Sequence, residues 1–351
     1  MSTPSSVESP SALETKPAMG RDQARFPDWY PEWARALADQ YSSGTTCLFL
    51  IHGNVRDLFR APGPDGVPRY FDLPEFLATQ VFGSWDVVCL HDVARGLSPM
   101  PGENAQRLQS MIKTLSARLG EPTGWPRDPD LLLASLDRLI ERNLLEVDPK
   151  NRKSMAFLFN YAQYLVPEGA ANALSRGQAT QIVRFLNWAH NPYLKRVNTA
   201  FCLINESLSE LNERLVRSSH ASTIAIPLPE REERKLYCDW VDGVDNASTT
   251  TSFSLAELAE MSNGLSLVNL EVLLKQGRQS GKVGDAGQFR ELKKTLIERQ
   301  CHGLIEFIEP KFTLDLLVGQ ESAKQRLRED AELLLKGKTD SAPMGYLLCG
   351  P

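Results

Sequence analysis

The sequence predicts an α/β protein in which a five-stranded parallel sheet lies between helices and is followed by a small helical unit. Five short segments are almost wholly apolar, as expected of strands that are covered on both faces. Amphipathic helical segments separate them, and this alternation is typical of a parallel sheet with crossover helices. After Pro229 the apolar segments stop and only helical periodicity continues, which indicates a separate helical unit.

The expected elements follow one another along the first 229 residues. Residues 1–25 are rich in Ser, Pro and Glu and hold few bulky apolar side chains, so we expect a disordered tail there. Strands are expected at residues 46–52, 86–92, 155–160, 199–204 and 223–226. Helices are expected at residues 31–40, 73–80, 104–118, 129–142, 178–190 and 208–216. The helical unit is expected to consist of helices at residues 230–241, 255–261, 267–276 and 288–306.

Composition and charge exclude several classes of protein. The net charge of −5 argues against the strongly basic surface that many nucleic-acid-binding proteins present. No apolar run approaches the roughly 18–20 residues that a membrane-spanning helix needs. The six cysteines show no C-x-x-C spacing and most of them lie in apolar runs, which indicates reduced core thiols rather than disulfides or zinc. We therefore expect a cytoplasmic protein without a membrane partner.

The last residues of the sequence have the pattern of a buried strand followed by a turn. The apolar run Tyr346–Cys349 has the length and residue types of an interior strand, and Gly350-Pro351 follows it. A phosphate-binding loop can begin in this way, because glycines let backbone N–H groups wrap around phosphates. A parallel strand can also end in Gly-Pro without binding phosphate. On the first interpretation, the chain is part of a longer protein and ends inside the loop.

This C-terminal segment resembles the AAA ATPases. In that family a segment with the pattern F-x-D-h-h-G-x-x-x-x-K is followed by a helix and a linker. A strand that ends in G-P-x-G-x-G-K-[ST] comes next. The resemblance rests on Phe312, Asp315, Val318, Gly319, Lys324, Gly350 and Pro351. It implies that the backbone of Val318 and Gly319 contacts the adenine of ATP. It also implies that Gly350 and Pro351 open the phosphate loop of the same site.

The rest of the chain is similar to one complete module of the same family, over roughly residues 45–300. Residues 224–234 resemble the junction between the α/β base and the helical lid, where the family has h-x-I-P-L-P-[DE]-x-x-x-R. Residues 263–270 resemble a lid motif that lies beside the nucleotide. Asn205 follows the fourth expected strand, at the position of a polar residue that senses nucleotide. The alternative is that Asn205 is only a turn residue at the end of a strand.

The residues that perform the family's chemistry are absent from this first module. Residues 52–57 follow the first expected strand but contain one Gly and no Gly-Lys-Ser/Thr, so they cannot form a ring of N–H donors for phosphates. The family has Asp-Glu after the third strand, where Asp holds Mg²⁺ and Glu activates water. Asn160 and Tyr161 replace this pair, and neither can serve in its place. No catalytic residue or metal ligand is therefore expected within residues 1–351.

At two further places the first module lacks the residue type that the family carries. Ser219 and Ser222 align with the family's arginine fingers, although Arg214 and Arg217 lie nearby in the sequence. Leu267 replaces the lid Gly that lies against the nucleotide, and we expect its side chain to crowd that pocket. Together with the altered loops, these differences predict a first module with the family fold and no ATPase activity.

The resemblance implies a tandem arrangement of four parts: a tail at residues 1–25, a degenerate base at 26–229, a lid at 230–306, and a linker with the start of a second module at 307–351. The complete protein is then expected to bind ATP and Mg²⁺ in its second module and to hydrolyse the ATP. Hydrolysis would remodel a macromolecular partner, expected to be a protein rather than a nucleic acid, and the subunits would form a ring-shaped homo-oligomer. The alternative is a non-catalytic AAA-like scaffold for oligomerisation or partner binding.

Overall fold

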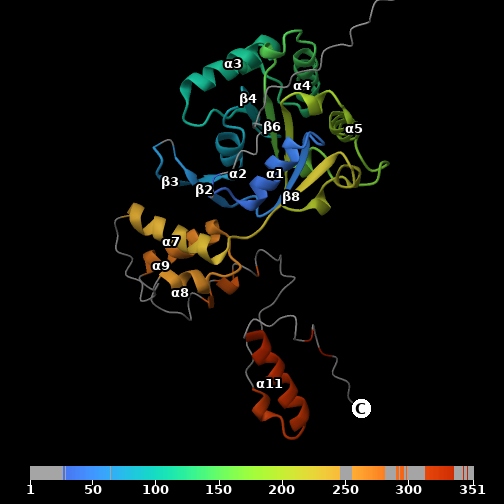
Figure 1. The fold of residues 1–351 in the computed structure, drawn as a ribbon. Coiled ribbons are helices and arrows are strands. Elements are labelled where there is room, and N and C mark those ends of the chain that lie inside the picture. The colour runs from blue at the N-terminus through green and yellow to red at the C-terminus, as the bar shows by residue number, and fades with distance from the viewer. Residues whose placement is uncertain are drawn as a thin grey trace, which may run out of the picture. The chain divides into compact units, whose positions relative to one another are not determined.

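The computed structural model describes residues 27, 29–63, 65–245, 255–280, 290–291, 293–295, 298, 313–335, 343 and 346. The chain divides into two compact units, Met1–Lys293 and Lys294–Pro351 (Figure 1). The first unit contains the sheet and the helical lid, and the second contains one long helix.

Among the described residues of the first unit, six strands form one sheet in the order β5-β4-β6-β7-β1-β8. The strands are β1 (Leu48–Gly53), β4 (Val87–Asp92), β5 (Gly96–Pro99), β6 (Met155–Asn160), β7 (Thr199–Ile204) and β8 (Ala221–Ile226). Five of them are parallel, in agreement with the predicted sheet. The sixth, β5, was not predicted and pairs antiparallel with β4. It is only four residues long and ends in Pro, so its strand conformation depends on its partner.

The expected helices of the base are present with small changes at their ends, except that the helix predicted at 208–216 is a 3-10 turn over Leu208–Glu210 followed by a separate four-residue helix. They are α1 (Glu32–Ser42), α2 (Leu73–Phe76), α3 (Ala105–Leu119), α4 (Pro129–Leu144), α5 (Arg176–His190) and α6 (Glu213–Val216). The predicted helix at 73–80 continues from α2 as a π-helix over Leu77–Val81. Four helices begin after a residue whose side chain accepts a hydrogen bond from the third helical amide: Asp72, Asn104, Asp128 and Ser175. Short 3-10 turns cover Pro122–Gly124, Pro149–Asn151, Ala162–Tyr164, Leu194–Arg196 and Leu208–Glu210.

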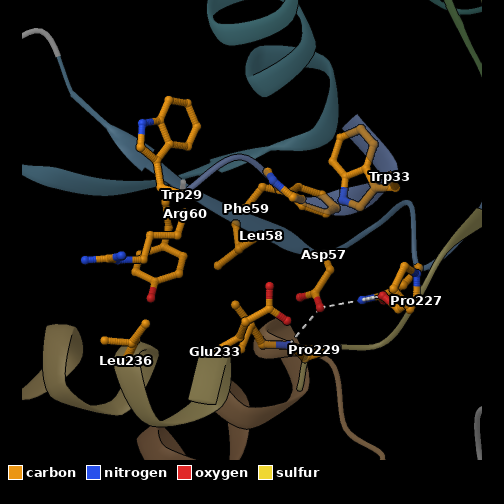
Figure 2. A pocket seen from close by; sticks show the side chains of 14 residues that line it. Trp29, Trp33, Asp57, Leu58, Phe59, Arg60, Pro227, Pro229, Glu233 and Leu236 are labelled. Atoms are coloured by element: carbon orange, nitrogen blue, oxygen red, sulfur yellow. Dashed lines mark hydrogen bonds between the residues drawn. The ribbon is translucent and has the colours of Figure 1, made fainter. Parts of the chain in front are cut away.

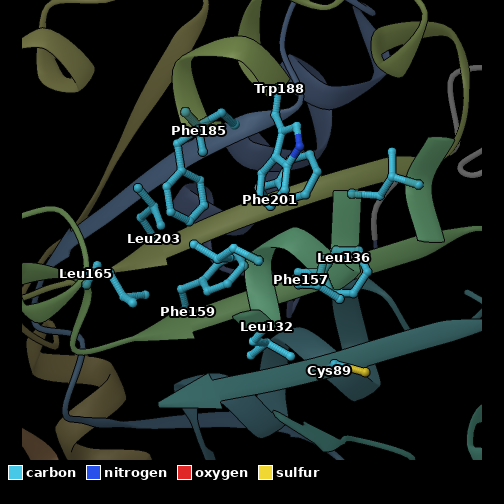
Figure 3. Packing of buried hydrophobic residues seen from close by; sticks show 14 of the residues in the cluster. Cys89, Leu132, Leu136, Phe157, Phe159, Leu165, Phe185, Trp188, Phe201 and Leu203 are labelled. Carbon is cyan, nitrogen blue, oxygen red and sulfur yellow. The ribbon is translucent and has the colours of Figure 1, made fainter. Parts of the chain in front are cut away.

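The hydrophobic core lies on both faces of the sheet. Along β6, Met155, Phe157 and Phe159 contribute to one cluster, and Ala156 and Leu158 contribute to the other. In the first cluster Phe201 is stacked between two aromatic rings, with centroids 5.9 Å from that of Phe157 and 4.5 Å from that of Trp188 (Figure 3). Because both faces are covered, neither side of the strand tolerates a polar residue. This burial is the physical reason for the continuous apolar runs in the sequence.

A two-stranded hairpin follows β1 and was not predicted. Its strands are β2 (Leu58–Pro62) and β3 (Pro68–Asp72), and they pair antiparallel. The ring of Phe59 packs 5.3 Å from that of Trp33, and the ring of Tyr70 packs 4.8 Å from that of Tyr237. The hairpin is thus stabilised by helices α1 and α7, which its own short sequence does not reveal.

The helical lid contains α7 (Arg231–Asp245), α8 (Leu255–Met261) and α9 (Leu267–Ser280), in agreement with three of the predicted helices. The fourth prediction, at 288–306, lies largely outside the described residues, although 290–291, 293–295 and 298 are helical. Arg234 is 3% exposed, and its guanidinium donates to the carbonyl oxygens of Pro229 and Ala259. This side chain therefore fixes the start of the lid to α8.

In the second unit, a 3-10 turn at Leu314–Leu316 precedes α11 (Glu321–Leu335), which is the charged helix expected there. Of the predicted strand Tyr346–Cys349, Tyr346 is not in a strand and its hydroxyl donates to Asp330, and residues 347–349 lie outside the described part. Among the helices that are described, none has both the length and the apolar character needed to cross a membrane.

Candidate functional site

The candidate site is the carboxyl edge of the sheet, where β1, β6, β7 and β8 end close together. Gly53 of β1 pairs with Ile226 of β8, and Asn160 of β6 pairs with Ile204 of β7. Ligands of open α/β sheets bind in the crevice outside the carboxyl ends of the strands. The loops that leave these strands therefore decide what the edge can bind.

The backbone of the loop after β1 is closed by internal hydrogen bonds. The N–H of Gly53 donates to Glu206 O at 3.0 Å, that of Asn54 donates to Ile226 O at 2.9 Å, and that of Val55 donates to Gly53 O at 2.8 Å. Gly53 has a φ of +94°, and a Cβ built there would lie 2.4 Å from Ile226 O. These three donors are thus turned toward protein carbonyls, and the chain then enters β2 at Leu58 rather than a helix.

The side chain of Arg56 crosses from this loop to the ends of β6 and β7. Its Nη1 donates to Asn160 Oδ1 at 2.5 Å, and its Nε donates to Glu206 Oε1 at 3.2 Å. Its guanidinium carbon lies 3.9 Å from the centroid of the Tyr161 ring, an arrangement that a cation–π contact favours. Tyr161 has a φ of +55°, which is unusual for a residue with a side chain. A protein cation therefore occupies this part of the edge.

The residues at the edge do not fit magnesium and a triphosphate. Mg²⁺ prefers carboxylate oxygens, whereas Asn160 offers an amide oxygen that already accepts from Arg56. Tyr161 offers a phenol in place of the carboxylate that would serve as a general base. No group of three or more His, Cys, Asp or Glu side chains that could hold a metal ion is found in the part of the chain that the structure describes.

The neighbouring residue, Asp57, points to the lid instead. Its side chain is 2% exposed. One carboxylate oxygen, Oδ2, accepts from the N–H of Leu267 at 3.0 Å and from the side-chain amide of Asn54 at 2.6 Å. The other oxygen, Oδ1, accepts from the N–H of Val268 at 3.0 Å. Leu267 and Val268 are the first residues of α9, so the carboxylate joins the base to the lid.

A small cavity of about 200 Å³ lies beside these groups, at the junction of base and lid (Figure 2). It is lined by Trp29, Pro31, Trp33, Asn54, Asp57, Leu58, Phe59, Arg60, Tyr70, Pro227, Pro229, Glu233, Leu236 and Leu267. Pockets that enclose ligands of drug size are larger, roughly 300–1,000 Å³. Leu267 is 3% exposed and lines this space. The crowding of a nucleotide by its side chain stays a prediction.

Asn205 lies at the predicted place, immediately after β7, and is fully buried. Its side-chain amide nitrogen donates to Ser207 O at 2.7 Å and to Glu210 Oε2 at 2.8 Å. Both contacts are within five residues along the chain, so the side chain stabilises its own turn. This geometry favours the simpler of the two interpretations of Asn205, a turn residue at a strand end.

The residues around the predicted arginine-finger positions are on or near the surface. The Ser222 hydroxyl bonds to the side chain of Gln40, and Ser219 is exposed. Arg214 and Arg217 are also exposed, and Arg217 Nη2 lies 2.5 Å from Glu213 Oε1. An arginine that acts on a neighbouring subunit has to be accessible, so the alternative of Arg214 and Arg217 stays open.

The predicted ATP-binding residues belong to the second unit. Val318 is 99% exposed, and Gly319 has a φ of +82°. Gly350 and Pro351 lie outside the described residues. The predicted adenine contact of Val318 and Gly319 therefore stays a prediction.

The role of Asp57 was missed in the sequence. The signal available was a pair of opposite charges, Arg56-Asp57, three residues after a buried strand. Nothing in that pair shows that Arg56 contacts Asn160 at the end of β6. Nor does it show that Asp57 accepts from Leu267, in a helix more than two hundred residues later.

Comparison with known proteins matches the two parts of the first unit separately. Residues 17–227 match the AAA+ chaperone, N-terminal Rossmann-like domain, and residues 232–302 match the AAA+ chaperone, second helical domain. No curated protein matches the chain in sequence. Among solved structures, a chain of the structure of the E. coli MS115-1 HORMA:CdnC:Trip13 complex is similar, with 12% identity and a TM-score of 0.43, covering 80% of this chain and 83% of that chain.

Proposed function

The chain belongs to the AAA+ chaperone family, and we propose that its residues 26–306 form a base and lid that neither bind nor hydrolyse ATP. The observation that carries this proposal is the closed loop after β1. Three successive N–H groups donate to protein carbonyls, and the charged side chains of Arg56 and Asp57 bind protein groups. A phosphate loop needs these donors to be free and to converge on the ligand.

The proposed work of this module is to hold the assembly together and to position an active second module. The sheet is packed on both faces and Arg234 is retained at the start of the lid, so the surfaces that meet neighbouring subunits can persist without chemistry. Head-to-tail contacts between identical subunits close into rings when the rotation permits. The ring, a homo-oligomer in the cytoplasm, is the assembly that we propose.

ATP and Mg²⁺ are assigned to the second module, which begins within residues 307–351. Val318 and Gly319 match the family's adenine-binding segment, and Gly350 and Pro351 match the start of its phosphate loop. In that site ATP hydrolysis would supply the free energy for remodelling a partner protein. The description of the family as a chaperone supports a protein as that partner.

Calorimetric titration of residues 1–351 with Mg·ATP tests the first part of this proposal. We expect no measurable heat of binding, and a dissociation constant in the low micromolar range would contradict it. Leu267→Gly is a useful companion variant because it restores the residue type that related lids carry. If the closed loop excludes the nucleotide, this variant also fails to bind. If Leu267→Gly binds ATP, the lid side chain alone was responsible and the loop argument is wrong.

ATPase assays on the chain extended through the second module test the remainder. Hydrolysis should be lost when the Lys of the completed Gly-rich loop becomes Ala, and should be unchanged in Arg56→Ala. Light scattering should show a higher oligomer that nucleotide strengthens, because a ligand that binds the assembled state favours assembly. A monomer that hydrolyses ATP at full rate would contradict the ring. An extended chain without G-x-G-K-[ST] after Pro351 would leave the non-catalytic scaffold as the function.

A further inference from the structure

We propose that Asp57 is a built-in anion that holds the lid on the base, at a helix end where a free anion would otherwise bind. The inference rests on the proposed function in one respect, namely that the first module works without ATP. The inference adds which group of the protein takes the place of a ligand, namely the Asp57 side chain. In this view the angle between base and lid is set by a side chain of the protein and does not depend on the nucleotide state of the first module.

The argument begins at the amino end of α9. The first amides of any helix lack partners within the helix and carry a partial positive charge. Here the amides of Leu267 and Val268 donate to the two oxygens of Asp57, each at 3.0 Å. The next amide, that of Asn269, donates to Ser266 Oγ at 3.2 Å. The amides of Leu267, Val268 and Asn269 are therefore all satisfied by side chains, and the charge of the helix end is met by a carboxylate.

The carboxylate comes from the base and is well held there. Asp57 lies 210 residues before Leu267 in the chain and is 2% exposed. A buried carboxylate is stable only when hydrogen bonds replace its lost water, and the Asn54 side chain supplies a third donor at 2.6 Å. Asn54 in turn is fixed by its own N–H, which donates to Ile226 O at 2.9 Å. The anion is thus anchored to the ends of β1 and β8.

Two other contacts between base and lid lie on the same side of the junction. The Tyr70 ring of the hairpin packs 4.8 Å from the ring of Tyr237 and 4.9 Å from the ring of Trp240. Aromatic contacts of this kind tolerate a range of centroid separations, roughly 4.5–7 Å. The bidentate contact of Asp57 with two successive amides is directional, so we assign to it the role of fixing the orientation of α9.

Hydrogen exchange without nucleotide tests this role in the full chain. In Asp57→Ala the amides of Leu267 and Val268 should exchange at least ~10-fold faster than in the wild type, since a hydrogen bond to a charged group contributes about 1.5–3 kcal/mol. Asp57→Asn keeps the shape of the side chain and loses its charge, so it provides the same measurement if Asp57→Ala does not fold. Asp65→Ala, an exposed carboxylate of the hairpin turn, is the matched control and should leave both amides protected. Equal protection in both Asp57 variants would overturn the proposal.

Inorganic phosphate, added at constant ionic strength against chloride, provides the second readout. It should slow the exchange of these two amides in Asp57→Ala and raise the Tm of that variant, because it can occupy the vacated helix end. It should not act on the wild type, where the carboxylate fills the place. Equal stabilisation of both proteins by phosphate would contradict the proposal. ATP binding by the wild type would instead refute the proposed function, so the two failures can be told apart.

Discussion

Two segments leave neighbouring strands of the sheet at paired residues, and each carries an arginine that is held in a different way. Gly53 of β1 pairs with Ile226 of β8. The segment after β8 leads to Arg234, which is 3% exposed and donates to buried carbonyls. The segment after β1 carries Arg56, whose side chain is 32% exposed and pairs with a still more exposed Glu206.

This difference separates an arginine of the base–lid junction from one that lies at the candidate site. The Arg234 guanidinium donates to carbonyl oxygens of the lid and its junction, and these contacts involve no ligand. Burial lowers the pKa of this guanidinium, and the hydrogen bonds to carbonyls offset that cost. The loop after β1 is held by backbone hydrogen bonds and by the contacts of Arg56 and Asp57 within the chain.

The largest effect is expected from Arg234→Met. The variant removes three hydrogen bonds from a buried charged group to the carbonyl oxygens of Pro229 and Ala259, and each bond of this kind contributes about 1.5–3 kcal/mol. Ala259 O keeps the Ser262 hydroxyl as a donor. We therefore expect the free energy of unfolding of the first unit to fall by about 4 kcal/mol, measured by urea denaturation. Arg234→Lys keeps the charge but cannot reach both carbonyls, so its loss should be smaller. A loss below about 1 kcal/mol in Arg234→Met would mean that the junction does not depend on this residue.

Gly53→Ala is the corresponding test of the loop. A Cβ at this position would lie 2.4 Å from Ile226 O, on a backbone with positive φ, and we expect a loss of about 3 kcal/mol in the same experiment. Gly66→Ala is a matched control, because Gly66 has a φ of +78° but a Cβ added there would have no neighbouring atom within 4 Å. Its cost should be only the backbone strain, about 1–2 kcal/mol. Equal losses in the two variants would mean that the backbone shifts and removes the close contact with Ile226 O.

A pH series extends the comparison to the end of β4. His91 is 1% exposed, its ring packs 5.7 Å from that of Phe159, and neither ring nitrogen has a hydrogen-bond partner among the described residues. Burial lowers its pKa to about 4, whereas an unfolded His titrates near 6.5. The stability from neutral His91 is therefore complete above pH 6.5 and is lost as the pH falls from 6.5 to 4.

Over that range the unfolded chain binds a proton that the folded chain does not, and the loss should reach about 3 kcal/mol. His91→Leu should remove this part of the pH dependence, while carboxylates that titrate in the same range remain in both proteins. The measurement is the free energy of unfolding at several pH values between 7 and 4. Parallel curves for the wild type and His91→Leu would show that His91 is protonated in the folded protein.

The smallest effect is expected from Arg56→Ala. Partly exposed ion pairs contribute about 0.2–1 kcal/mol and exposed cation–π contacts contribute a similar amount, so the loss should be close to about 1 kcal/mol. The same urea experiment measures it. A loss as large as that of Arg234→Met would remove the contrast between the two segments. The loop after β1 would then contribute as much to the free energy of unfolding as the junction after β8.

Most of the fold could be predicted because burial leaves a direct mark on the sequence. Four of the five parallel strands are largely buried, so each is mainly a run of apolar residues such as residues 155–159. The edge strand β8 is buried only at Ile224 and Ile226. The hairpin of β2 and β3 has no such run, since only Phe59 and Ala61 of β2 and Phe71 of β3 are buried. It exists because Phe59 and Tyr70 pack on helices that lie elsewhere in the sequence.

The sequence by itself determined what the first module lacks: Gly-Lys-Ser/Thr after β1, and Asp-Glu after β6. Residue types alone decide this, because Asn160 and Tyr161 carry no carboxylate. Only the tertiary structure decided which groups Arg56 and Asp57 contact. Arg56 and Asp57 are adjacent, yet one reaches Asn160, 104 residues later, and the other reaches Leu267, 210 residues later. Parallel crossovers bring such distant segments to one edge, and no local spacing in a sequence records which of them will meet.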